Sequence, residues 1–513
     1  MISWPDNSPQ SSQLDELLAG LGCIEPIPSL KVTGITLDSK KTVAGSLFIA
    51  INGSVHHGLN FASEAVSRDA VAIAYDPAGT TDDILDFERK ACVLLAIPRL
   101  GKKLELVAGR FYKHPSRDLA VIGITGTNGK TSSSHLLAQA LSKSHSCGVI
   151  GTLGWGFPDQ LKALQNTTPD SLVINGILAS FRSRNTEFVA MEVSSHGLDQ
   201  GRTRGIVFKG AAFTNITRDH LDYHKTMRVY IGAKLKLLEA PGLEFVVINL
   251  DDKHADQVLS AVPPNVRILG FSRGDDNKSP FARLKFSTLR HDEKGVALQV
   301  QFENKSVLVS APVFCDFNVE NLMTALGVML ELGIPLTKAV EVLETVKPVS
   351  GRLERFSVEG STPTIIVDYA HTPHALQSIL DGLRIHCSGS LWLVFGCGGD
   401  RDRGKRPIMG RIAETKSDFV FITDDNPRTE DGDAIVRDIL RGCQDPGITV
   451  MRDRNKAIRT AIERAGVNDL VVIAGKGHEN TQEINGKKYP FDDRLIVGSA
   501  VAQRAELAGI SIQ

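Results

Sequence analysis

A buried strand that runs through a glycine-rich loop into a helix is the feature that most constrains this fold. Residues 119–124 have the apolar pattern of a strand, and residues 132–141 have helical spacing. Between them, glycines let backbone N–H groups face phosphate oxygens, and the helix N-terminus adds positive potential. Lys130 would neutralise phosphate charge, and Thr131 would reach Mg²⁺. The loop consists of Thr125, Gly126, Thr127, Asn128, Gly129, Lys130 and Thr131.

The spacing departs from the strict Walker pattern, because Ile124 stands where the first glycine belongs. An ordinary glycine-rich turn is the alternative interpretation. It is disfavoured because Gly129, Lys130 and Thr131 stand at the start of the helix. We therefore expect a variant phosphate loop.

The rest of the chain alternates strands with helices, which predicts an α/β protein with a mainly parallel central sheet and a second, doubly wound domain. Its 513 residues suffice for about three to four domains of ordinary size. The polar segment 275–294 is expected to form an excursion or a hairpin. Further strands are expected at 45–53, 188–193, 210–215, 245–250, 364–369, 391–395, 419–423 and 470–474, and helices at 61–67, 99–113, 318–331 and 335–346.

Charge and composition exclude several classes of protein. With 58 Lys+Arg against 59 Asp+Glu, the chain has no global field that would hold a nucleic acid or an anionic membrane. No stretch approaches the ~18 apolar residues of a membrane span, and the N-terminus does not resemble an export signal. The 7 cysteines are odd in number and never form a CxxC pair, so we expect them to be reduced. We expect a cytoplasmic monomer.

Oxygen and imidazole ligands follow two of the expected strands. Glu192 ends the strand 188–193, and an acid at the carboxyl end of a buried parallel strand suits Mg²⁺. The next strand leads to Asp219, His220 and Asp222. Taken alone, His220 is more often a hydrogen-bonded structural histidine. Beside Glu192 and a phosphate loop, it is expected to bind the metal.

These motifs occur in an order that resembles the UDP-N-acetylmuramoyl-peptide ligases, the ATP-dependent enzymes of bacterial cell-wall synthesis. The resemblance covers nearly the whole chain. Its motifs are the phosphate loop, Asn166-Thr-Thr168, Met191-Glu-Val-Ser-Ser-His196, Asp219-His-Leu-Asp222, Lys234, Phe317-Asn-Val-Glu-Asn321, Gly351-Arg352, Asp368-Tyr-Ala-His-Thr-Pro373 and Gly475-Lys-Gly-His-Glu479.

The resemblance implies three domains: an N-terminal α/β domain that binds the uridine nucleotide (1–100), a central ATPase (101–346) and a Rossmann-like C-terminal domain that brings the amino acid (347–513). It also implies site residues. ATP would contact the phosphate loop, Asn321, Arg352 and Asp368. The UDP-muramoyl dipeptide would contact Leu37, Ser39, Ser54, Val55, His56, Asn166, Thr167, Thr168, Ser194, Gln200 and Arg202.

Within the family, two motifs resemble the members that add meso-diaminopimelate to UDP-N-acetylmuramoyl-L-alanyl-D-glutamate. Members that use L-lysine differ at the second of them. The first motif is Phe395-Gly-Cys-Gly-Gly-Asp-Arg401, and the second is Asp425-Asn-Pro-Arg428. The implied contacts to diaminopimelate are Arg401, Asp425, Asn426, Pro427, Arg428, Gly475 and Glu479.

The implied reaction forms an amide through an acyl phosphate made from ATP, with Lys130, Glu192, His220 and Lys234 as the catalytic residues. Lys234 lies on a helix and would ordinarily be solvated. By resemblance it carries a carbamate derived from CO₂. The implied Mg²⁺ ligands are Thr131, Glu192, His220 and Lys234.

Some positions depart from the family pattern, and some alternatives stay open. Cys315 replaces a common glycine, His374 replaces an aspartate, and Asn480-Thr481 replaces Asp-Tyr. The alternative substrates within the family are L-lysine and D-alanyl-D-alanine. The alternative classes are an NAD-dependent oxidoreductase, because Gly396 to Arg401 imitates a dinucleotide fingerprint without its third glycine, and a nucleotide switch without ligation.

Overall fold

The computed structural model describes residues 11–53, 56–80, 92–274, 279–292 and 295–508. The chain forms two compact units, which are described separately. The first comprises Met1–Phe271 with Gly327–Leu332, and the second comprises Ser272–Leu326 with Gly333–Gln513.

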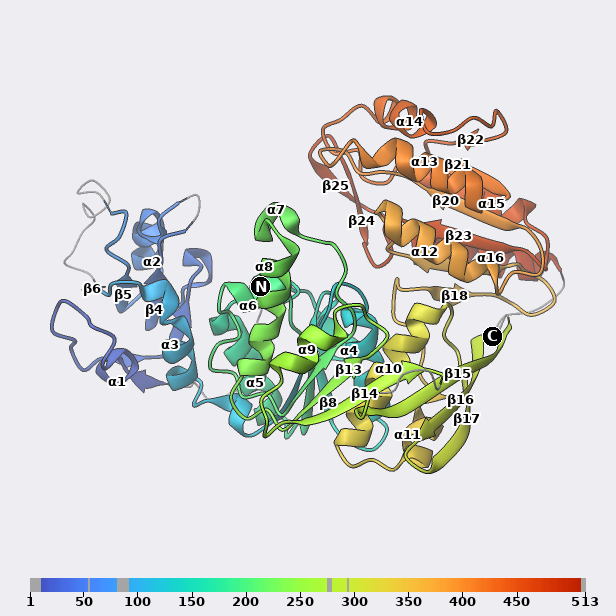
Figure 1. Ribbon diagram of the computed structural model, residues 1–513. Helices are drawn as coiled ribbons and strands as arrows, with labels where there is room; N and C mark the ends of the chain where they lie inside the picture. Colours follow the sequence, from blue (N-terminus) through green and yellow to red (C-terminus); the bar gives the residue numbers. More distant parts are fainter. Residues whose placement is uncertain (1–10, 54–55, 81–91, 275–278, 293–294, 509–513) are drawn as a thin grey trace. The chain divides into compact units, whose positions relative to one another are not determined.

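The first unit begins with a small four-stranded parallel sheet, in the order β3-β4-β5-β6. Alternate side chains of its strands point to opposite faces. Both sets are buried, so helices cover both faces of the sheet. On one face Leu47 and Ile49 pack with α1 and α3, and on the other Phe48 packs with α2 (Figure 1). The elements are α1 (Leu14–Leu18), β3 (Gly34–Thr36), β4 (Ser46–Ala50), α2 (Ala62–Ser67), β5 (Ala72–Tyr75), β6 (Val93–Ala96) and α3 (Leu104–Phe111).

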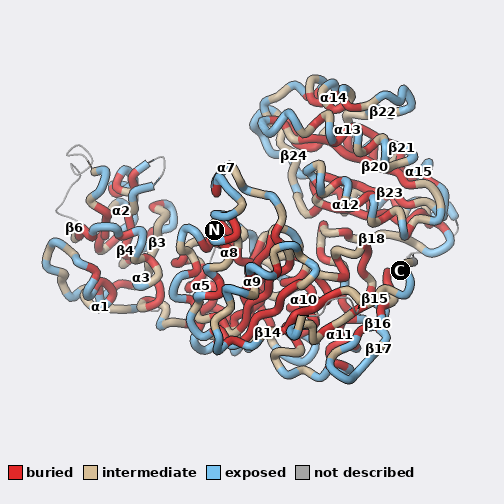
Figure 2. The backbone as a smooth tube through the Cα atoms, viewed as in Figure 1, coloured by how far each residue is buried: buried red, intermediate tan, exposed pale blue. Residues whose placement is uncertain are grey.

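The larger sheet of the first unit has a parallel core in the order β8-β11-β7-β12-β13-β14. Its strands are buried on both faces, as expected where helices cover a parallel sheet (Figure 2). An antiparallel pair, β9 and β10, extends one edge. The elements are β7 (Ala120–Thr125), α4 (Lys130–Leu141), β8 (Cys147–Gly151), β9 (Gly154–Phe157), β10 (Gln160–Lys162), α5 (Ser171–Ser183), β11 (Phe188–Glu192), β12 (Gly210–Phe213), α8 (Met227–Leu235), β13 (Phe245–Asn249), α9 (Ala255–Ala261) and β14 (Arg267–Arg273).

The second unit contains an antiparallel meander and a second α/β sheet. The meander consists of β15 (Ala282–Asp292), β16 (Gly295–Phe302) and β17 (Lys305–Ala311), so the described part of the polar segment 275–294 supplies one strand of a hairpin whose second strand lies beyond that segment. Two helices, α10 (Asp316–Glu331) and α11 (Leu336–Leu343), follow it, and residues 327–332, which include the end of α10, belong to the first unit.

The second sheet has the order β18-β19-β23-β20-β21-β22, and only β18 runs antiparallel to its neighbour. Three helices, α12, α13 and α14, cover one face, and α15 and α16 cover the other, which confirms a Rossmann-like arrangement. The elements are β18 (Glu354–Phe356), β19 (Thr364–Asp368), α12 (Pro373–Arg384), β20 (Leu391–Phe395), α13 (Lys405–Lys416), β21 (Phe419–Ile422), α14 (Gly432–Leu440), β22 (Thr449–Val450), α15 (Arg454–Arg464), β23 (Leu470–Ala474), β24 (Thr481–Ile484), β25 (Lys487–Pro490) and α16 (Asp493–Leu507).

Most expected elements are in place, and the largest difference concerns the helix expected at 99–113. The structure has a 3₁₀ turn at Leu100–Lys102 and then α3 at Leu104–Phe111. The helix ends early because Lys113 and His114 adopt positive φ (57° and 46°), and His114 precedes a proline, which disfavours helical backbone.

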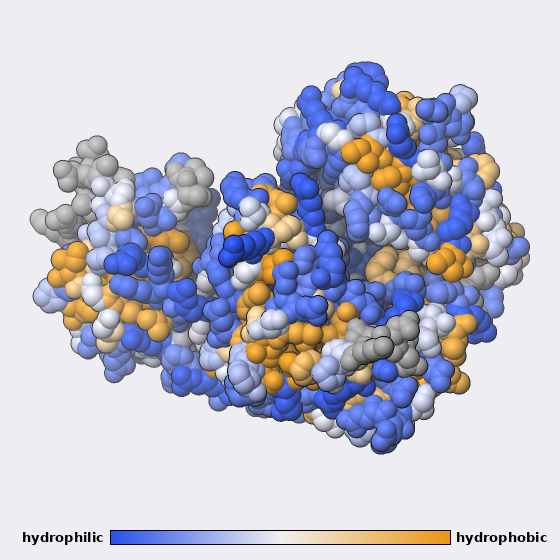
Figure 3. All heavy atoms as spheres, viewed as in Figure 1, coloured by the Kyte–Doolittle hydropathy of each residue, from blue (hydrophilic) through white to orange (hydrophobic). Residues whose placement is uncertain are grey.

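The surface, the cysteines and the helices can be compared with what the composition predicts. Hydrophilic residues cover most of the face that Figure 3 shows, and apolar residues form several separate patches among them. All seven cysteines are free thiols. Among the described residues, every helix is too short or too polar to cross a bilayer.

We predict that Asp493→Ala strongly destabilises the second unit. Asp493 and Arg454 are both fully buried, and their side chains are joined at 2.7 Å. The variant leaves a buried guanidinium without its carboxylate, which typically costs about 3–5 kcal/mol. The free energy of unfolding, measured with urea, tests this. Glu244→Ala is the control, because its pair with Lys209 is exposed and is expected to contribute under about 1 kcal/mol.

Candidate active site

The phosphate loop joins the carboxyl end of β7 to α4, and the end of β12 fixes its shape. Gly126 is required because a Cβ atom there would overlap Thr214 Oγ1, and Gly129 has a φ of 85° at the helix start. Thr214 Oγ1 donates to the Asn128 carbonyl at 2.6 Å. Asn215 Oδ1 accepts from the Asn128 N–H at 2.9 Å. The backbone conformation of the loop is therefore set by a neighbouring strand.

Two lysines meet at one carbonyl oxygen of this loop. Lys130 Nζ donates to the carbonyls of Gly126 and Thr127, both at 2.8 Å. Lys234 Nζ, from α8, donates to the same Gly126 carbonyl at 2.7 Å. Lys234 is only 1% exposed, and this burial, together with the charge of Lys130, holds its pKa well below the usual value. The ordinary expectation of a solvated lysine is wrong here.

Tyr230 links the phosphate loop to Lys234 and was not among the residues that the sequence singled out. Its Oη lies 2.9 Å from Thr127 Oγ1, and the Lys234 Nζ lies 4.7 Å from the centre of its ring. The ring is buried, and burial raises the pKa of Tyr230. Helical spacing could have found it, because Tyr230 stands four residues before Lys234 and shares its face of α8.

Glu192 lies fully buried at the end of β11, beside the start of α4. Its carboxylate accepts from Thr131 Oγ1 at 2.9 Å, from the Thr152 N–H at 2.9 Å and from Thr152 Oγ1 at 3.0 Å. A Cβ at Gly151 would overlap Glu192 Oε1, so glycine makes room for the carboxylate. The sequence patterns did not identify Thr152, although its place after β8, beside β11 in the sheet, is a usable signal.

This donor set fits Mg²⁺. The ion prefers oxygen ligands and usually binds through one or two carboxylates together with substrate phosphates and water. Thr131 and Glu192 supply a hydroxyl and a carboxylate at one point beside the phosphate loop. In the part of the chain that the structure describes, no group of three or more His, Cys, Asp or Glu side chains is arranged for a metal. Substrate phosphates and water would supply further oxygen ligands.

His220 lies in a cluster of histidines on the segment after β12. It has a φ of 51° just before α7 (Leu221–His224), and its Nε2 is 3.4 Å from Asp219. Its ring centre is 4.8 Å from that of His196. Burial, and then the charges of His220 and His224, lower the pKa of His196. His224, in the same segment, is buried with Nε2 3.0 Å from Ser195 Oγ.

The positions expected to bind the muramoyl dipeptide gather around the end of β11. Thr168 Oγ1 donates to the Glu192 carbonyl and accepts from the Ser194 N–H, both at 2.9 Å. Arg202 Nη1 donates to the Thr168 carbonyl at 2.7 Å, and its Nε donates to Gln200 Oε1 at 2.9 Å. Thr167 Oγ1 lies 3.0 Å from Thr152 Oγ1. Asn166 precedes this group in an exposed segment.

The described positions expected to bind the uridine nucleotide lie in the segments that follow β3 and β4 of the N-terminal sheet. Leu37 follows β3, and Ser39 Oγ donates to Glu64 at 2.6 Å. The His56 ring packs edge-on against Phe61. Ser54 and Val55 lie outside the described residues.

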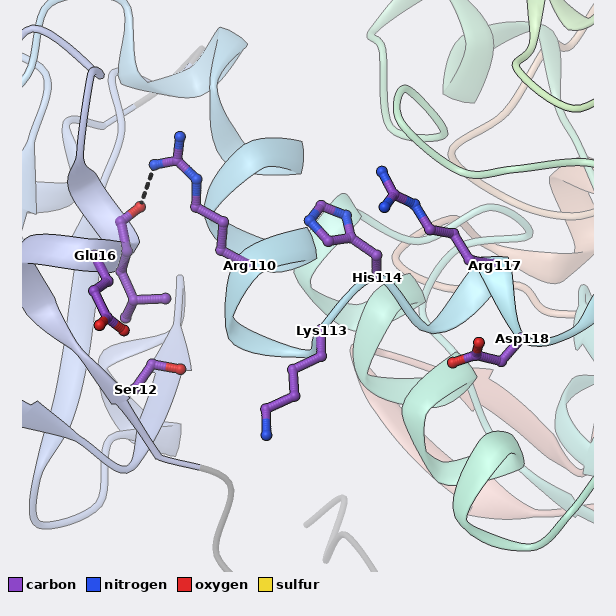
Figure 4. A pocket seen from close by; sticks show the side chains of 8 residues that line it. Ser12, Glu16, Arg110, Lys113, His114, Arg117 and Asp118 are labelled. Atoms are coloured by element: carbon purple, nitrogen blue, oxygen red, sulfur yellow. Dashed lines mark hydrogen bonds between the residues drawn. The ribbon is translucent and has the colours of Figure 1, made fainter.

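A cavity of about 480 Å³ lies elsewhere in the first unit, between α1 and the segment that leaves α3 (Figure 4). Arg110 Nη1, on its wall, donates to the Leu17 carbonyl at 2.8 Å. Lys113 and Arg117 point in different directions, so their charges do not converge on one ligand. The lining contains none of the expected site residues; it consists of Ser12, Glu16, Leu17, Arg110, Lys113, His114, Arg117 and Asp118.

In the second unit, two of the expected nucleotide contacts, Asp368 and Arg352, lie around the end of β19. Asp368 accepts from the N–H groups of Leu353 (2.8 Å) and Ala370 (2.7 Å), and burial raises its pKa. The Arg352 guanidinium lies 4.6 Å from the ring centre of Tyr369. Asn321, on α10, donates to Asn318 Oδ1 at 3.0 Å.

Two of the departures from the family pattern now have a structural context. Cys315 has a φ of 66°, the left-handed conformation that favours glycine, which explains why glycine is common at this position. His374 is exposed in the first turn of α12.

The residues expected to contact diaminopimelate come from loops at the carboxyl ends of β20, β21 and β23. Arg428 Nη1 donates to the Gly399 carbonyl at 2.7 Å. Asn426 Nδ2 donates to Glu479 Oε2 at 2.8 Å. Asp425 is buried, its pKa is raised by burial, and a Cβ at Gly475 would lie 2.5 Å from its Oδ2. Pro427 follows in the same loop, and Arg401 Nη1 donates to the Asp400 carbonyl at 3.2 Å.

Lys476 organises these loops, although no sequence pattern singled it out. It is fully buried and donates to Asn426 Oδ1 (3.1 Å), Glu479 Oε2 (3.2 Å) and the Thr481 carbonyl (2.7 Å). Three acceptors satisfy the three N–H groups of the ammonium. Its place in the Gly475 to Glu479 motif was the available signal.

His478 predicts a pH dependence of stability. Burial, and then the charge of Arg352, lower its pKa to about 4 from an ordinary value near 6.5. Because the unfolded chain binds this proton more readily, His478 lowers the free energy of unfolding as the pH falls from about 6.5 towards 4. Between pH 7 and pH 5, His478→Gln should lose about 1–2 kcal/mol less stability than the unmodified protein. Urea unfolding at both pH values tests this, and an equal loss in the two proteins would contradict it.

A variant phosphate loop at the carboxyl edge of a parallel sheet, with a buried carboxylate beside its Thr131, defines a nucleotide-binding α/β enzyme. Residues 124–329 match the model of the Mur ligase middle domain, and residues 351–477 match that of the Mur ligase glutamate ligase domain. The chain belongs to the Mur ligase family, which confirms the resemblance and places it among ATP-dependent amide ligases.

Individual members of the family match this chain over nearly its full length. The chain is 44% identical to the UDP-N-acetylmuramoyl-L-alanyl-D-glutamate--2,6-diaminopimelate ligase of Alkalilimnicola ehrlichii, over 92% of this chain and 95% of that one. It is 42% identical to the ligase of the same name from Pseudomonas aeruginosa, over 90% and 94%.

Solved structures of Mur ligases share the fold of this chain. A structure with the same ligase name matches 96% of this chain and 99% of its own at 34% identity, with a TM-score of 0.69. A MurF structure from Acinetobacter baumannii shares the fold at 17% identity, with a TM-score of 0.65, and covers 91% of this chain and 96% of its own. Family membership sets aside the dehydrogenase and switch alternatives.

Proposed function

We propose that the protein joins meso-diaminopimelate to UDP-N-acetylmuramoyl-L-alanyl-D-glutamate, with cleavage of ATP to ADP and phosphate, in the synthesis of peptidoglycan precursors. The observation that carries the proposal is the loop Asp425-Asn-Pro-Arg428, whose arginine lies at the carboxyl edge of the Rossmann-like sheet. The names of the relatives support the same substrates.

Activation of the carboxylate is the first step. An oxygen of the D-glutamate γ-carboxylate attacks the γ-phosphorus of ATP, the bond from that phosphorus to the ADP oxygen breaks, and an acyl phosphate forms. Both reactants are anions, so cations must offset their repulsion. Lys130, placed on the phosphate loop, would exchange its bonds to loop carbonyls for phosphate oxygens. Thr131 and Glu192 would hold Mg²⁺, which supplies further positive charge when bound.

Amide formation is the second step. The amine nitrogen of diaminopimelate attacks the acyl carbon, loses a proton, and the phosphate leaves from the tetrahedral intermediate. The positioning of the two reactants can supply much of the rate, because well-oriented groups reach effective molarities of about 10⁵ M or more. Thr168, Ser194 and Arg202 are proposed to position the muramoyl peptide at the end of β11.

Lys234 is proposed to carry a carbamate. Its neutral Nζ bonds to the carbon of CO₂ and loses one proton, which replaces a cation by an anionic oxygen ligand. The burial that lowers its pKa favours the neutral amine this reaction needs. The carbamate and His220 would complete the protein side of the Mg²⁺ site.

Several expectations stay predictions. They are the domain division at 1–100, 101–346 and 347–513, a monomeric state and a cytoplasmic location. The remaining nucleotide contacts proposed are Asn321, Arg352 and Asp368. The proposed contacts to the uridine nucleotide include Leu37, Ser39 and His56.

We predict that protein equilibrated with ¹³C-bicarbonate shows a carbamate carbon signal by NMR, and that Lys234→Arg lacks it. The signal should fade as the pH falls, because protonation removes the nucleophilic amine. Lys236→Ala is the control, because Lys236 is half-exposed and paired with Asp199 at 2.7 Å. An active preparation with no such signal in the presence of bicarbonate would refute the carbamate.

We also predict a strong preference for meso-diaminopimelate over L-lysine. Diaminopimelate carries a second carboxylate at the end of its side chain, and the planar fork of Arg428 can bind it through two charge-assisted hydrogen bonds. Loss of such a contact costs about 2–5 kcal/mol, so Arg428→Ala should raise KM for diaminopimelate at least about 30-fold. KM for ATP should stay within about 2-fold.

A panel of amino acids scored for ADP release, with the muramoyl dipeptide present, tests this preference. Arg437→Ala is the matched control, because that arginine is exposed on α14. Equal use of the two amino acids by the unmodified enzyme would overturn the assignment.

A further inference from the structure

The β24–β25 hairpin holds the backbone of the loop Asp425-Asn-Pro-Arg428. The Arg428 N–H donates to the Glu483 carbonyl at 2.9 Å, and the Asn485 N–H donates to the Arg428 carbonyl at 2.6 Å. The Glu483 N–H donates to Asn426 Oδ1 at 2.9 Å. Gln482 Nε2 donates to the Asp425 carbonyl at 2.9 Å. Three neighbouring residues of the hairpin thus bind the loop along its length.

The conformation of the hairpin is set by its own turn. Its turn consists of Asn485 and Gly486, with φ of 50° and 71°, the Asn-Gly pair typical of a tight two-residue hairpin turn. Arg428 itself has a φ of 53°, a left-handed conformation that is unfavourable for arginine. The bridge between Arg428 and Ile484 keeps the arginine in that conformation. The direction in which Arg428 leaves the backbone therefore depends on the hairpin.

The side chain of Arg428 is held from two sides. Its Nη1 donates to the Gly399 carbonyl at 2.7 Å, and its Nε lies 3.5 Å from Glu483 Oε2. The two side chains are 20% and 30% exposed, so the pair is partly shielded from water. Contacts at Nη1 and Nε fix the plane of the guanidinium, and neither contact uses the N–H groups of Nη2.

We propose that Glu483 is a positioning residue that selects amino acids with a carboxylate at the end of the side chain, because it orients Arg428. The inference rests on the proposed function, since it assigns Arg428 the recognition of that carboxylate. Sequence comparison within the motif would not find Glu483, because it lies on the hairpin, past the Gly475 to Glu479 motif and far from Arg428 along the chain.

The test measures KM and kcat for diaminopimelate, ATP and L-lysine in Glu483→Ala, alone and combined with Arg428→Ala. Glu483→Ala should raise KM for diaminopimelate about 5- to 10-fold, narrow the preference over L-lysine, and leave kcat and KM for ATP within about 2-fold. In the Arg428→Ala background it should change KM for diaminopimelate less than about 1.5-fold, because the residue it orients is gone.

Two further variants separate orientation from stability. Glu483→Gln keeps a side chain of the same length with an oxygen at its end, and should restore KM for diaminopimelate to within about 2-fold of the unmodified enzyme. Lys488→Ala changes the cross-strand neighbour of Glu483, which is exposed, and should leave all constants unchanged.

The outcomes distinguish the inference from the function on which it rests. If Arg428→Ala leaves KM for diaminopimelate unchanged, the assignment of Arg428 and the inference are both wrong. If Arg428→Ala raises KM but Glu483→Ala does not, the inference alone is overturned. The inference is also overturned if Glu483→Ala acts equally in both backgrounds, or if Glu483→Gln raises KM as much as Glu483→Ala does.

Discussion

Lys130 and Lys234 both donate a hydrogen bond to the carbonyl oxygen of Gly126. These two bonds connect the phosphate loop with helices α4 and α8. The carbonyl belongs to the phosphate loop, Lys130 to the helix that the loop opens, and Lys234 to a helix far along the chain. Two ammonium groups this close repel each other, and burial adds to the cost of charging Lys234. The arrangement is therefore suited to a lysine that reacts as a neutral amine.

The same edge of the sheet places the other partners. Parallel strands end at one edge, so the loops after β7, β8, β11 and β12 meet there although they are distant in sequence. Glu192 receives three hydrogen bonds from threonines of two of these loops. A carboxylate held in this way keeps its position before any ion or nucleotide arrives.

The second unit uses the same principle with different chemistry. Lys476, Asn426 and Glu479 join the loops at the carboxyl ends of β21 and β23, and Arg428 joins the β21 loop to the loop after β20 through the Gly399 carbonyl. The hairpin after β23 then fixes Arg428. The proposed recognition of an amino acid with a carboxylate at the end of its side chain would depend on such fixed directions, because that carboxylate must meet a cation.

The α/β class, most strands, the phosphate loop, the position of Glu192 and the family follow from the sequence, because these depend on local periodicity and on residues adjacent in the chain. The other features depend on how the elements pack. Burial of Lys234, the contacts of Tyr230 and Thr152 with the site, and the pairing of Glu483 with Arg428 arise between residues far apart in sequence, where only the packing of strands and helices sets the distances. Local patterns carry no record of such distances, so a single sequence predicts the loops but not the contacts that orient them.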